Sequence, residues 1–137
     1  MSIVDLGLKR FAHAHALLTQ NIDKGVGTGD QFSKEIDGIG GALIVNGLAQ
    51  MLAMAQAGSG ERKHVTFTVA QWVCDWLTLQ CGSLLPVGTK PGIWGLVEAI
   101  TQIEDRAAVR HLEEEAIEYL AAIKMLAKAA KAKGKTS

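Results

Sequence analysis

The chain has 137 residues and a formal net charge of zero, with 48% hydrophobic, 20% charged and only 5% aromatic residues. A neutral chain of this size is not a general binder of polyanions, so any contact with nucleic acid requires a local basic patch or an assembly. The composition is that of an ordinary globular protein, and no run of about 18 apolar residues is present that could span a membrane. We therefore predict one domain over residues 1–137, working in the cytoplasm.

Clusters of glycine divide the chain into segments whose apolar residues recur at three- and four-residue steps, which is typical of helices. The N-terminal segment carries Asp5, Lys9 and Arg10 within its apolar pattern, which favours a helix over a signal peptide. The sequence predicts an all-α fold, a compact bundle of about five or six helices. The expected helices cover residues 2–23, 30–57, 66–81, 93–103 and 107–132. We expect the chain after about Lys131 to fray.

The second expected helix contains an Asn46-Gly47 pair, which between apolar residues usually signals a hairpin turn. The surrounding apolar residues keep helical spacing, so we predict one continuous helix with Asp30 as its N-cap. A glycine inside a helix costs about 1 kcal/mol, which suggests close approach of a neighbouring helix or of a partner at Gly47. For Asn46 we expect the side-chain amide to hold a neighbouring backbone group. The glycine-rich stretch 38–41 predicts an irregular start or close helix packing.

Two cysteines, Cys74 and Cys81, lie on the third expected helix. Their spacing separates them by roughly 10 Å along the helix axis, which a disulfide cannot span. We predict that both are reduced thiols in the core. Asp75 follows Cys74 and would raise the pKa of its thiol, which argues against a catalytic cysteine.

No residue pattern predicts a metal centre, a cofactor or a phosphate-binding loop. His13 and His15 point about 200° apart on a helix, so we expect surface histidines rather than two ligands of one metal. His64 and His111 are isolated and match no metal-ligand spacing. The glycine-rich stretch 25–29 follows a helix rather than a strand and lacks the lysine of a phosphate-binding loop, so we expect a flexible turn.

The last expected helix carries its acidic residues early and its lysines late, which complements the helix dipole. The acidic cluster at 113–118 is accordingly expected on a solvated face. Lys124, Lys128 and Lys131 share one face of this helix, and that basic patch could contact phosphates or simply solubilise the C-terminus. Core packing rather than base stacking is expected of the three tryptophans, Trp72, Trp76 and Trp94.

Two stretches resemble a known family. Residues 43–53, with Asn46-Gly47-Leu48 at their centre, resemble a helix of the small subunit of type III-B (Cmr) CRISPR effector complexes. The shared pattern is an aliphatic residue, two others, Asn-Gly-Leu, one other and Gln. Residues 110–120 resemble the C-terminal helix of the same family, with the pattern Arg, x, Leu, x, x, Glu-Ala, x, x, x, Leu. The chain departs from the family after this motif, with Ala122-Ile123 where Trp-Leu is frequent.

The resemblance implies a non-catalytic helical subunit that stacks in several copies as a minor filament beside the backbone subunits holding the guide RNA. A basic surface of that filament lines the channel for the target RNA, and cleavage belongs to other subunits. The implied partners are the backbone and large subunits, further copies of the chain, and target RNA opposite guide RNA, with no cofactor or small-molecule substrate. Arg110, which falls within the second motif, is the first candidate for contact with RNA. Further candidates are Lys34, Arg62, Lys63, Lys124 and Lys128. Asn46 and Gly47 are expected to serve packing or a subunit interface.

Three other functions remain open on the sequence. The first is the equivalent small subunit of the type III-A system, which is also a small helical protein. The second is an unrelated helical module for protein interaction or oligomerisation, in which Gly47 and the alanine-rich faces would dock a partner. The third is a small enzyme, which no constellation of residues supports.

Overall fold

A computed structural model describes residues 3–58 and 63–136 of the chain. Within these residues it contains six α-helices, one short 3₁₀ turn and no strand, which confirms the predicted all-α fold. The elements are α1 (Ile3–Asp23), α2 (Gly29–Asn46), α3 (Leu48–Ala57), α4 (Lys63–Cys81), η1 (Gly82–Leu84), α5 (Gly92–Thr101) and α6 (Arg106–Thr136). None of the helices, over the residues described, is long and apolar enough to cross a membrane.

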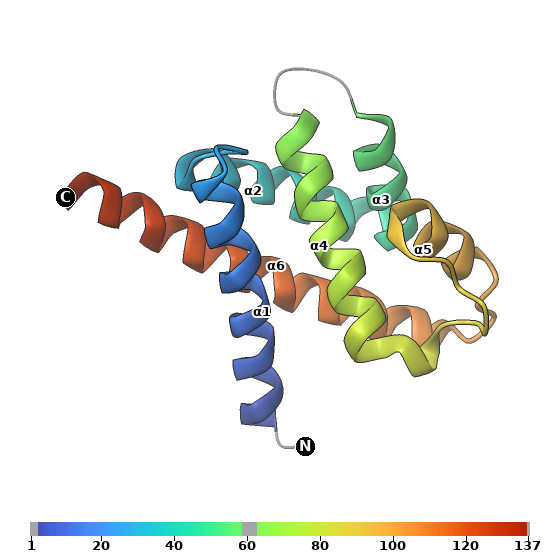
Figure 1. Cartoon of the computed structure of the whole chain (residues 1–137). Helices are drawn as coiled ribbons and strands as arrows, with labels where there is room; N and C mark the ends of the chain where they lie inside the picture. Colours follow the sequence, from blue (N-terminus) through green and yellow to red (C-terminus); the bar gives the residue numbers. More distant parts are fainter. Residues whose placement is uncertain (1–2, 59–62, 137) are drawn as a thin grey trace.

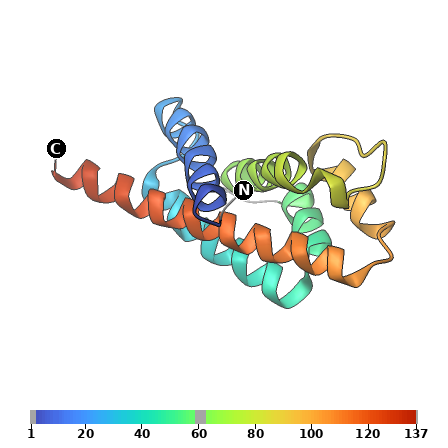
Figure 2. The same cartoon turned by 90° about the horizontal axis from the view of Figure 1, so that it is seen from below.

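Helix α6 is the longest element, with 31 residues, and runs along the length of the molecule (Figure 1). Helix α2 lies beside it, and α1 and α4 also contact it (Figure 2). Helices α3 and α5 pack against each other and against α4, at the end where α6 begins. Apolar side chains from all six helices meet in one core, and its largest fully buried members include Trp76, Tyr119, Phe32, Leu48 and Met51.

Helices α2 and α6 are antiparallel, and polar contacts along them set their register. The side chain of Asp30 pairs with that of Lys131 at 2.6 Å, and Asp37 pairs with Lys124. Just beyond the end of α2, the backbone N–H of Leu48 donates to Glu113 of α6 at 2.8 Å. Each step forward along α2 is matched by a similar step back along α6, so the two helices stay aligned over their shared length.

The predicted continuous helix over residues 30–57 is wrong, because α2 ends at Asn46 and α3 begins at Leu48. Gly47 lies between them with φ 84° and ψ 168°, a conformation that is essentially restricted to glycine. The N-cap of α2 is Thr28 rather than Asp30. Thr28 and Gln31 form a capping box. The hydroxyl of Thr28 accepts a hydrogen bond from the N–H of Gln31 at 3.2 Å, and the side chain of Gln31 accepts one from the N–H of Thr28 at 2.8 Å.

The expectations of irregular backbone and close packing in the stretch 38–41 are also wrong. Helix α2 continues through Gly38, Gly40 and Gly41. A Cβ atom built at any of the three would meet nothing within 4 Å. These glycines therefore face open space rather than another helix of the chain.

Other helix boundaries differ from the prediction by a few residues. Helix α4 starts at Lys63 rather than at 66, α5 ends at Thr101 rather than at 103, and α6 continues to Thr136, past the predicted end at 132. Residues 102–105 separate the last two helices, which places the break close to the gap between the predicted ranges 93–103 and 107–132. There the carboxylate of Asp105 accepts a hydrogen bond from the N–H of Ala107 at 2.9 Å, which satisfies a free donor at the start of α6.

The tryptophans divide between core and surface. Trp72 and Trp76 are buried, as predicted. Trp94 is 58% exposed, so its expected core packing is wrong. It lies in the first turn of α5, where the buried face is formed instead by Ile93 and Leu96.

Candidate functional site

The two motif stretches meet in space, through residues that lie 65 positions apart in the sequence. Glu113 of the second motif accepts a hydrogen bond from the N–H of Leu48 in the first, with its Oε2 at 2.8 Å. That N–H is one of the donors left free at the start of α3, and a carboxylate there also interacts favourably with the helix dipole. A Cβ on Gly47 would lie 3.0 Å from the same Oε2. The absence of a side chain at Gly47 therefore leaves room for the carboxylate. The Asn-Gly pair is thus a helix break that Glu113 caps.

Asn46 does not hold a backbone group, contrary to expectation. Its side-chain amide points instead toward the sulfur of Met54, with 3.9 Å between Nδ2 and Sδ. The side chain of Asn46 is exposed, as are those of its neighbours Ile44 and Val45.

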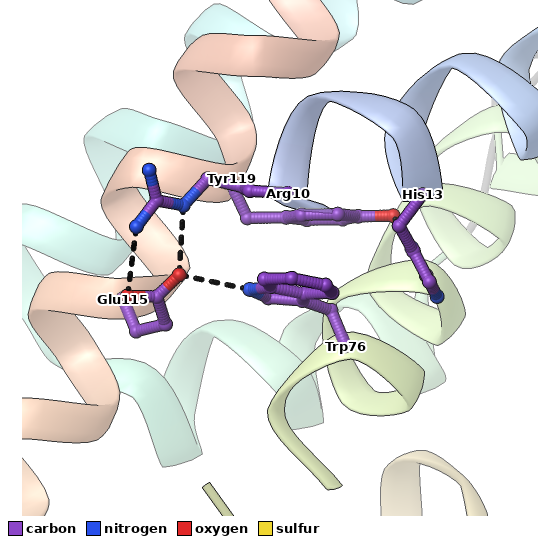
Figure 3. Close-up of polar contacts among 5 residues, drawn as sticks. All are labelled: Arg10, His13, Trp76, Glu115 and Tyr119. Atoms are coloured by element: carbon purple, nitrogen blue, oxygen red, sulfur yellow. Dashed lines mark hydrogen bonds and ion pairs between the residues drawn. The ribbon is translucent and has the colours of Figure 1, made fainter. Parts of the chain in front are cut away.

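A polar cluster lies within the core, where α1, α4 and α6 meet (Figure 3). The guanidinium of Arg10 donates twice to the carboxylate of Glu115, at 2.7 and 3.0 Å. The indole N–H of Trp76 donates to the same carboxylate at 2.9 Å. Glu115 is only 8% exposed, and such a buried charge is tolerated because three donors and one opposite charge satisfy it.

His13 extends this cluster on the side of α1. Its Nδ1 lies 2.6 Å from the hydroxyl of Tyr119, and its Nε2 lies 2.9 Å from the carboxylate of Asp75. The rings of Trp76 and Tyr119 stack beside it with centroids 5.6 Å apart (Figure 3). The prediction of a surface histidine is therefore wrong for His13, whereas His15 is exposed as expected.

The pKa values in this cluster follow from burial and from charge. Burial alone would raise the pKa of Glu115, but the hydrogen bonds from Arg10 and Trp76 and the charge of Arg10 outweigh it, so the pKa is lowered. The hydrogen bond from Arg10 to Glu115 raises the pKa of the guanidinium in turn. Burial, and then the charge of Asp75, raise the pKa of Tyr119. At neutral pH the Arg10–Glu115 pair is fully charged and the Tyr119 hydroxyl is protonated.

The two cysteines are free, buried thiols, as predicted. Burial, and secondarily the charge of Asp75, raise the pKa of Cys74 to about 12. Burial, and secondarily the charge of Glu115, raise the pKa of Cys81 to about 11. Both thiols are therefore protonated at neutral pH, which leaves little thiolate to act as a nucleophile.

Sequence reasoning missed the polar cluster, although a signal for it is present. Glu115 lies three residues after buried Leu112 and four before buried Tyr119, so it occupies a core position of α6. Arg10 lies four residues before buried Ala14 on the inner face of α1. Opposite charges at core positions of two helices indicate a buried pair. The solvated face predicted for 113–118 is accordingly wrong for Glu115.

The structure separates the six candidate RNA contacts into three groups. Lys34 pairs with Asp30 at 3.1 Å, and Lys124 pairs with Asp37. Arg62 and the side chain of Lys63 lie outside the part of the chain that the structure describes. Arg110 and Lys128 are exposed, and no acidic residue in the described ranges pairs with either. They are 18 residues apart on α6, about five helical turns, so both side chains leave the same face of the helix, about 27 Å apart.

No three His, Cys, Asp or Glu side chains gather as a potential metal site in the parts of the chain that the structure describes. The polar cluster is instead a structural tie between α1, α4 and α6. The fold and this tie define a small all-α protein whose longest helix carries, on one face, exposed cations that no acidic residue in the described ranges pairs with, Arg110 and Lys128 among them.

The CRISPR-associated protein (Cas_Cmr5) family model matches residues 8–130. The chain belongs to this family, which confirms the resemblance drawn from residues 43–53 and 110–120. Comparison with curated proteins and with solved structures gives no match.

Proposed function

We propose that this chain is the non-catalytic small subunit of a type III-B (Cmr) RNA-targeting effector complex in the cytoplasm. Several copies stack as a minor filament, beside the subunits that hold the guide RNA, and line the channel for the target RNA. The observation that carries the proposal is the family match over residues 8–130, in which the two motifs form one contact between Leu48 and Glu113. Base pairing with the guide supplies sequence specificity, and this chain contributes weak contacts to the RNA backbone.

The distribution of charge supports a role along an RNA backbone. Arg110 and Lys128 mark one face of α6 toward its two ends, while the neighbouring lysines Lys34, Lys124 and Lys131 are paired with Asp30 or Asp37. One copy therefore offers few free cations on this face, which gives weak binding. A row of copies repeats the same face, and modest contacts then act together.

The RNA contacts are tested by the salt dependence of binding. We expect wild-type protein to bind single-stranded RNA weakly, with a slope of log K against log [salt] that reports the phosphates contacted. Replacing Arg110 and Lys128 together by Ala should reduce that slope by about 0.7 for each phosphate that the variant no longer binds. Lys34→Ala with Lys124→Ala is the matched control, because it also removes two positive charges, but from lysines that pair with Asp30 and Asp37. Equal reductions in the control and in the variant of Arg110 and Lys128 would contradict the assignment.

The assembly and the absence of catalysis are tested together by purification from the native host. The tagged chain should co-purify with a guide RNA, backbone subunits and the large subunit of a type III-B complex, in several copies by native mass spectrometry. A type III-A large subunit in its place would favour that alternative. The isolated chain should leave target RNA intact with and without divalent cations. RNA cleavage by the isolated chain that a carboxylate or imidazole variant abolishes would overturn the proposal.

A further inference from the structure

Tyr119 is the only tyrosine of the chain, and it lies fully buried in the polar cluster beside His13 (Figure 3). Its hydroxyl is 2.6 Å from Nδ1 of His13, and Nε2 of the same ring is 2.9 Å from the carboxylate of Asp75. A carboxylate only accepts hydrogen bonds, so Nε2 carries a proton. In a neutral imidazole Nδ1 is then the acceptor, and the hydroxyl of Tyr119 donates to it. The phenolic proton therefore lies one hydrogen bond away from a base.

The phenol does not release this proton by simple ionisation. Burial, and then the charge of Asp75, raise the pKa of Tyr119, because a buried phenolate would lose its water and lie near another anion. Loss of one electron changes this, since an oxidised phenol is a strong acid. The proton can then move to Nδ1 along the short hydrogen bond, while the imidazolium keeps its contact with Asp75. The new positive charge is thus formed next to a carboxylate, and the oxidised ring is neutral.

We propose that Tyr119 is a redox-active tyrosine, which small radical oxidants oxidise reversibly with His13 as the proton acceptor. One electron passes to the oxidant, the O–H bond of Tyr119 breaks, and an N–H bond forms at Nδ1 of His13. The products are a neutral tyrosyl radical and an imidazolium paired with Asp75. One electron from a reductant such as ascorbate returns the proton to Tyr119. This activity requires neither RNA nor another subunit, so it is independent of the proposed function.

Trp76 provides the path for the electron. Its ring stacks on that of Tyr119 at an interplanar angle of 10°, with centroids 5.6 Å apart, and lies 5.2 Å from the ring of His13. The indole N–H of Trp76 donates to Glu115, whose pKa is below its ordinary value. Such a carboxylate is a weaker base than an imidazole, whose unperturbed pKa is about 6.5. An electron hole formed on Trp76 therefore moves to Tyr119, which has the better proton acceptor.

Other oxidisable side chains of the core compete poorly with Tyr119. Burial, and secondarily the charge of a nearby carboxylate, raise the pKa of Cys74 to about 12 and that of Cys81 to about 11. Both remain thiols at neutral pH, and a thiol is oxidised much less readily than a thiolate. Trp72 stacks on Phe32, a ring that cannot take up a proton.

The test is pulse radiolysis of the full chain with azide radicals, which take one electron from indoles and phenols. Every protein in the series carries Trp94→Phe, because the exposed indole of Trp94 would otherwise consume the oxidant. Since the chain has one tyrosine, any tyrosyl absorption comes from Tyr119. We expect this absorption to rise as the indolyl absorption decays, and to disappear when ascorbate is added.

Two variants change the proton chemistry but keep the hydrogen bonds. His13→Gln offers an amide oxygen to the phenol but is not a base, so the tyrosyl absorption should rise more slowly by about tenfold or more. Asp75→Asn still accepts from Nε2 but no longer balances the imidazolium, so it should also slow the rise. The side chain of Asp75 is 70% exposed, which makes this replacement mild for the fold. His15→Gln, at an exposed histidine of the same helix, is the control and should leave the rate unchanged.

Slower tyrosyl formation in His13→Gln and Asp75→Asn than in His15→Gln, with all three folded by circular dichroism, supports the proposal. A purely structural role of the cluster would change stability without changing this rate. If His13→Gln does not fold, Asp75→Asn decides alone. The absence of a tyrosyl absorption in the Trp94→Phe protein overturns the proposal, and so does a rate in Asp75→Asn equal to that of the control.

Discussion

Glu115 shows how one buried carboxylate can join three helices. Its two oxygens accept two hydrogen bonds from Arg10 of α1 and one from Trp76 of α4. A buried ion pair adds little net stability relative to apolar residues of similar size, but removing one partner leaves the other charge buried and unpaired. The cluster therefore specifies where α1 docks on α4 and α6 more than how stable the fold is.

Truncation of Glu115 tests this interpretation. Glu115→Ala leaves the guanidinium of Arg10 without its acceptor, and we expect a loss of about 3 kcal/mol in the free energy of unfolding. The measurement is urea denaturation at neutral pH. Glu114→Ala is the matched control, because the neighbouring carboxylate is exposed and should change stability by no more than about 0.5 kcal/mol. If Glu115→Ala also lost no more than about 0.5 kcal/mol of unfolding free energy, the cluster would contribute no docking energy.

The same carboxylate predicts how stability depends on pH. The pKa of Glu115 is lower in the folded chain than its ordinary value of about 4.3. Its contribution is therefore complete above that ordinary pKa, and it is lost as pH falls through the lower pKa of the folded state. Wild type should lose its advantage over Glu115→Gln on acidification, and the two unfolding curves should converge. A stability difference that is constant from pH 7 to pH 2 would contradict this assignment.

Residue-scale prediction from sequence succeeded where only local chemistry is involved. The buried, unreactive thiols of Cys74 and Cys81 follow from their positions on an apolar helix. Trp94 was wrongly assigned to the core because helical spacing identifies an apolar face, but not whether another element covers it. Arg10 and Glu115 lie at opposite ends of the chain: the core position of each can be read from local spacing, but local spacing does not show which charge it meets.

At the scale of the elements, Gly47 has a different role from the glycines of α2. Its φ of 84° and ψ of 168° lie in a region that side chains avoid, and an added Cβ would lie 3.0 Å from Glu113. We predict that Gly47→Ala costs about 2 kcal/mol of unfolding free energy. Gly40→Ala is the control in the same helix pair. It should be neutral or stabilising by up to about 1 kcal/mol, because Gly40 is helical and faces open space.

The measurement for this pair is thermal unfolding followed by circular dichroism. A Gly47→Ala variant as stable as wild type would mean that α2 and α3 can fuse into one helix. That outcome would restore the continuous helix predicted from the sequence. Helical content distinguishes the two cases, since fusion adds helix at residue 47.

The helices were predictable because their apolar residues recur with the period of a helix, and those residues are the ones that the core buries. The break at Gly47 was not predictable from this pattern. Leu43 and Met51 flank it at helical spacing, so periodicity runs through the break without interruption. What decides for two helices is the carboxylate of Glu113, which caps α3 from another helix and compensates for the interrupted backbone hydrogen bonds.

At the scale of the whole molecule, a net charge of zero conceals an internal arrangement of charge. Asp30 and Asp37 of α2 pair with Lys131 and Lys124 of α6, and Asp30 also contacts Lys34 of its own helix. The hydrogen bond from Lys131, and then that from Lys34, lower the pKa of Asp30 to about 2. Acidic residues of the chain itself thus pair with two of the three lysines of the basic patch, Lys124 and Lys131. Of the candidate RNA contacts whose side chains the structure describes, Arg110 and Lys128 stay unpaired.

Removing the charges of Asp30 and Asp37 should leave Lys124 and Lys131 free to contact RNA. In the variant Asp30→Asn with Asp37→Asn, the lysines of α6 lose their partners, and we expect tighter and more salt-dependent binding to single-stranded RNA. The slope of log K against log [salt] should steepen by up to about 0.7 for each lysine that gains a phosphate. Fluorescence anisotropy at several salt concentrations measures it. The control, Glu98→Gln with Glu104→Gln, adds the same net charge near α5, at the other end of the molecule. If the Asp30→Asn with Asp37→Asn variant steepens the slope more than this control does, the effect comes from the α2–α6 face. Equal slopes would assign it to net charge.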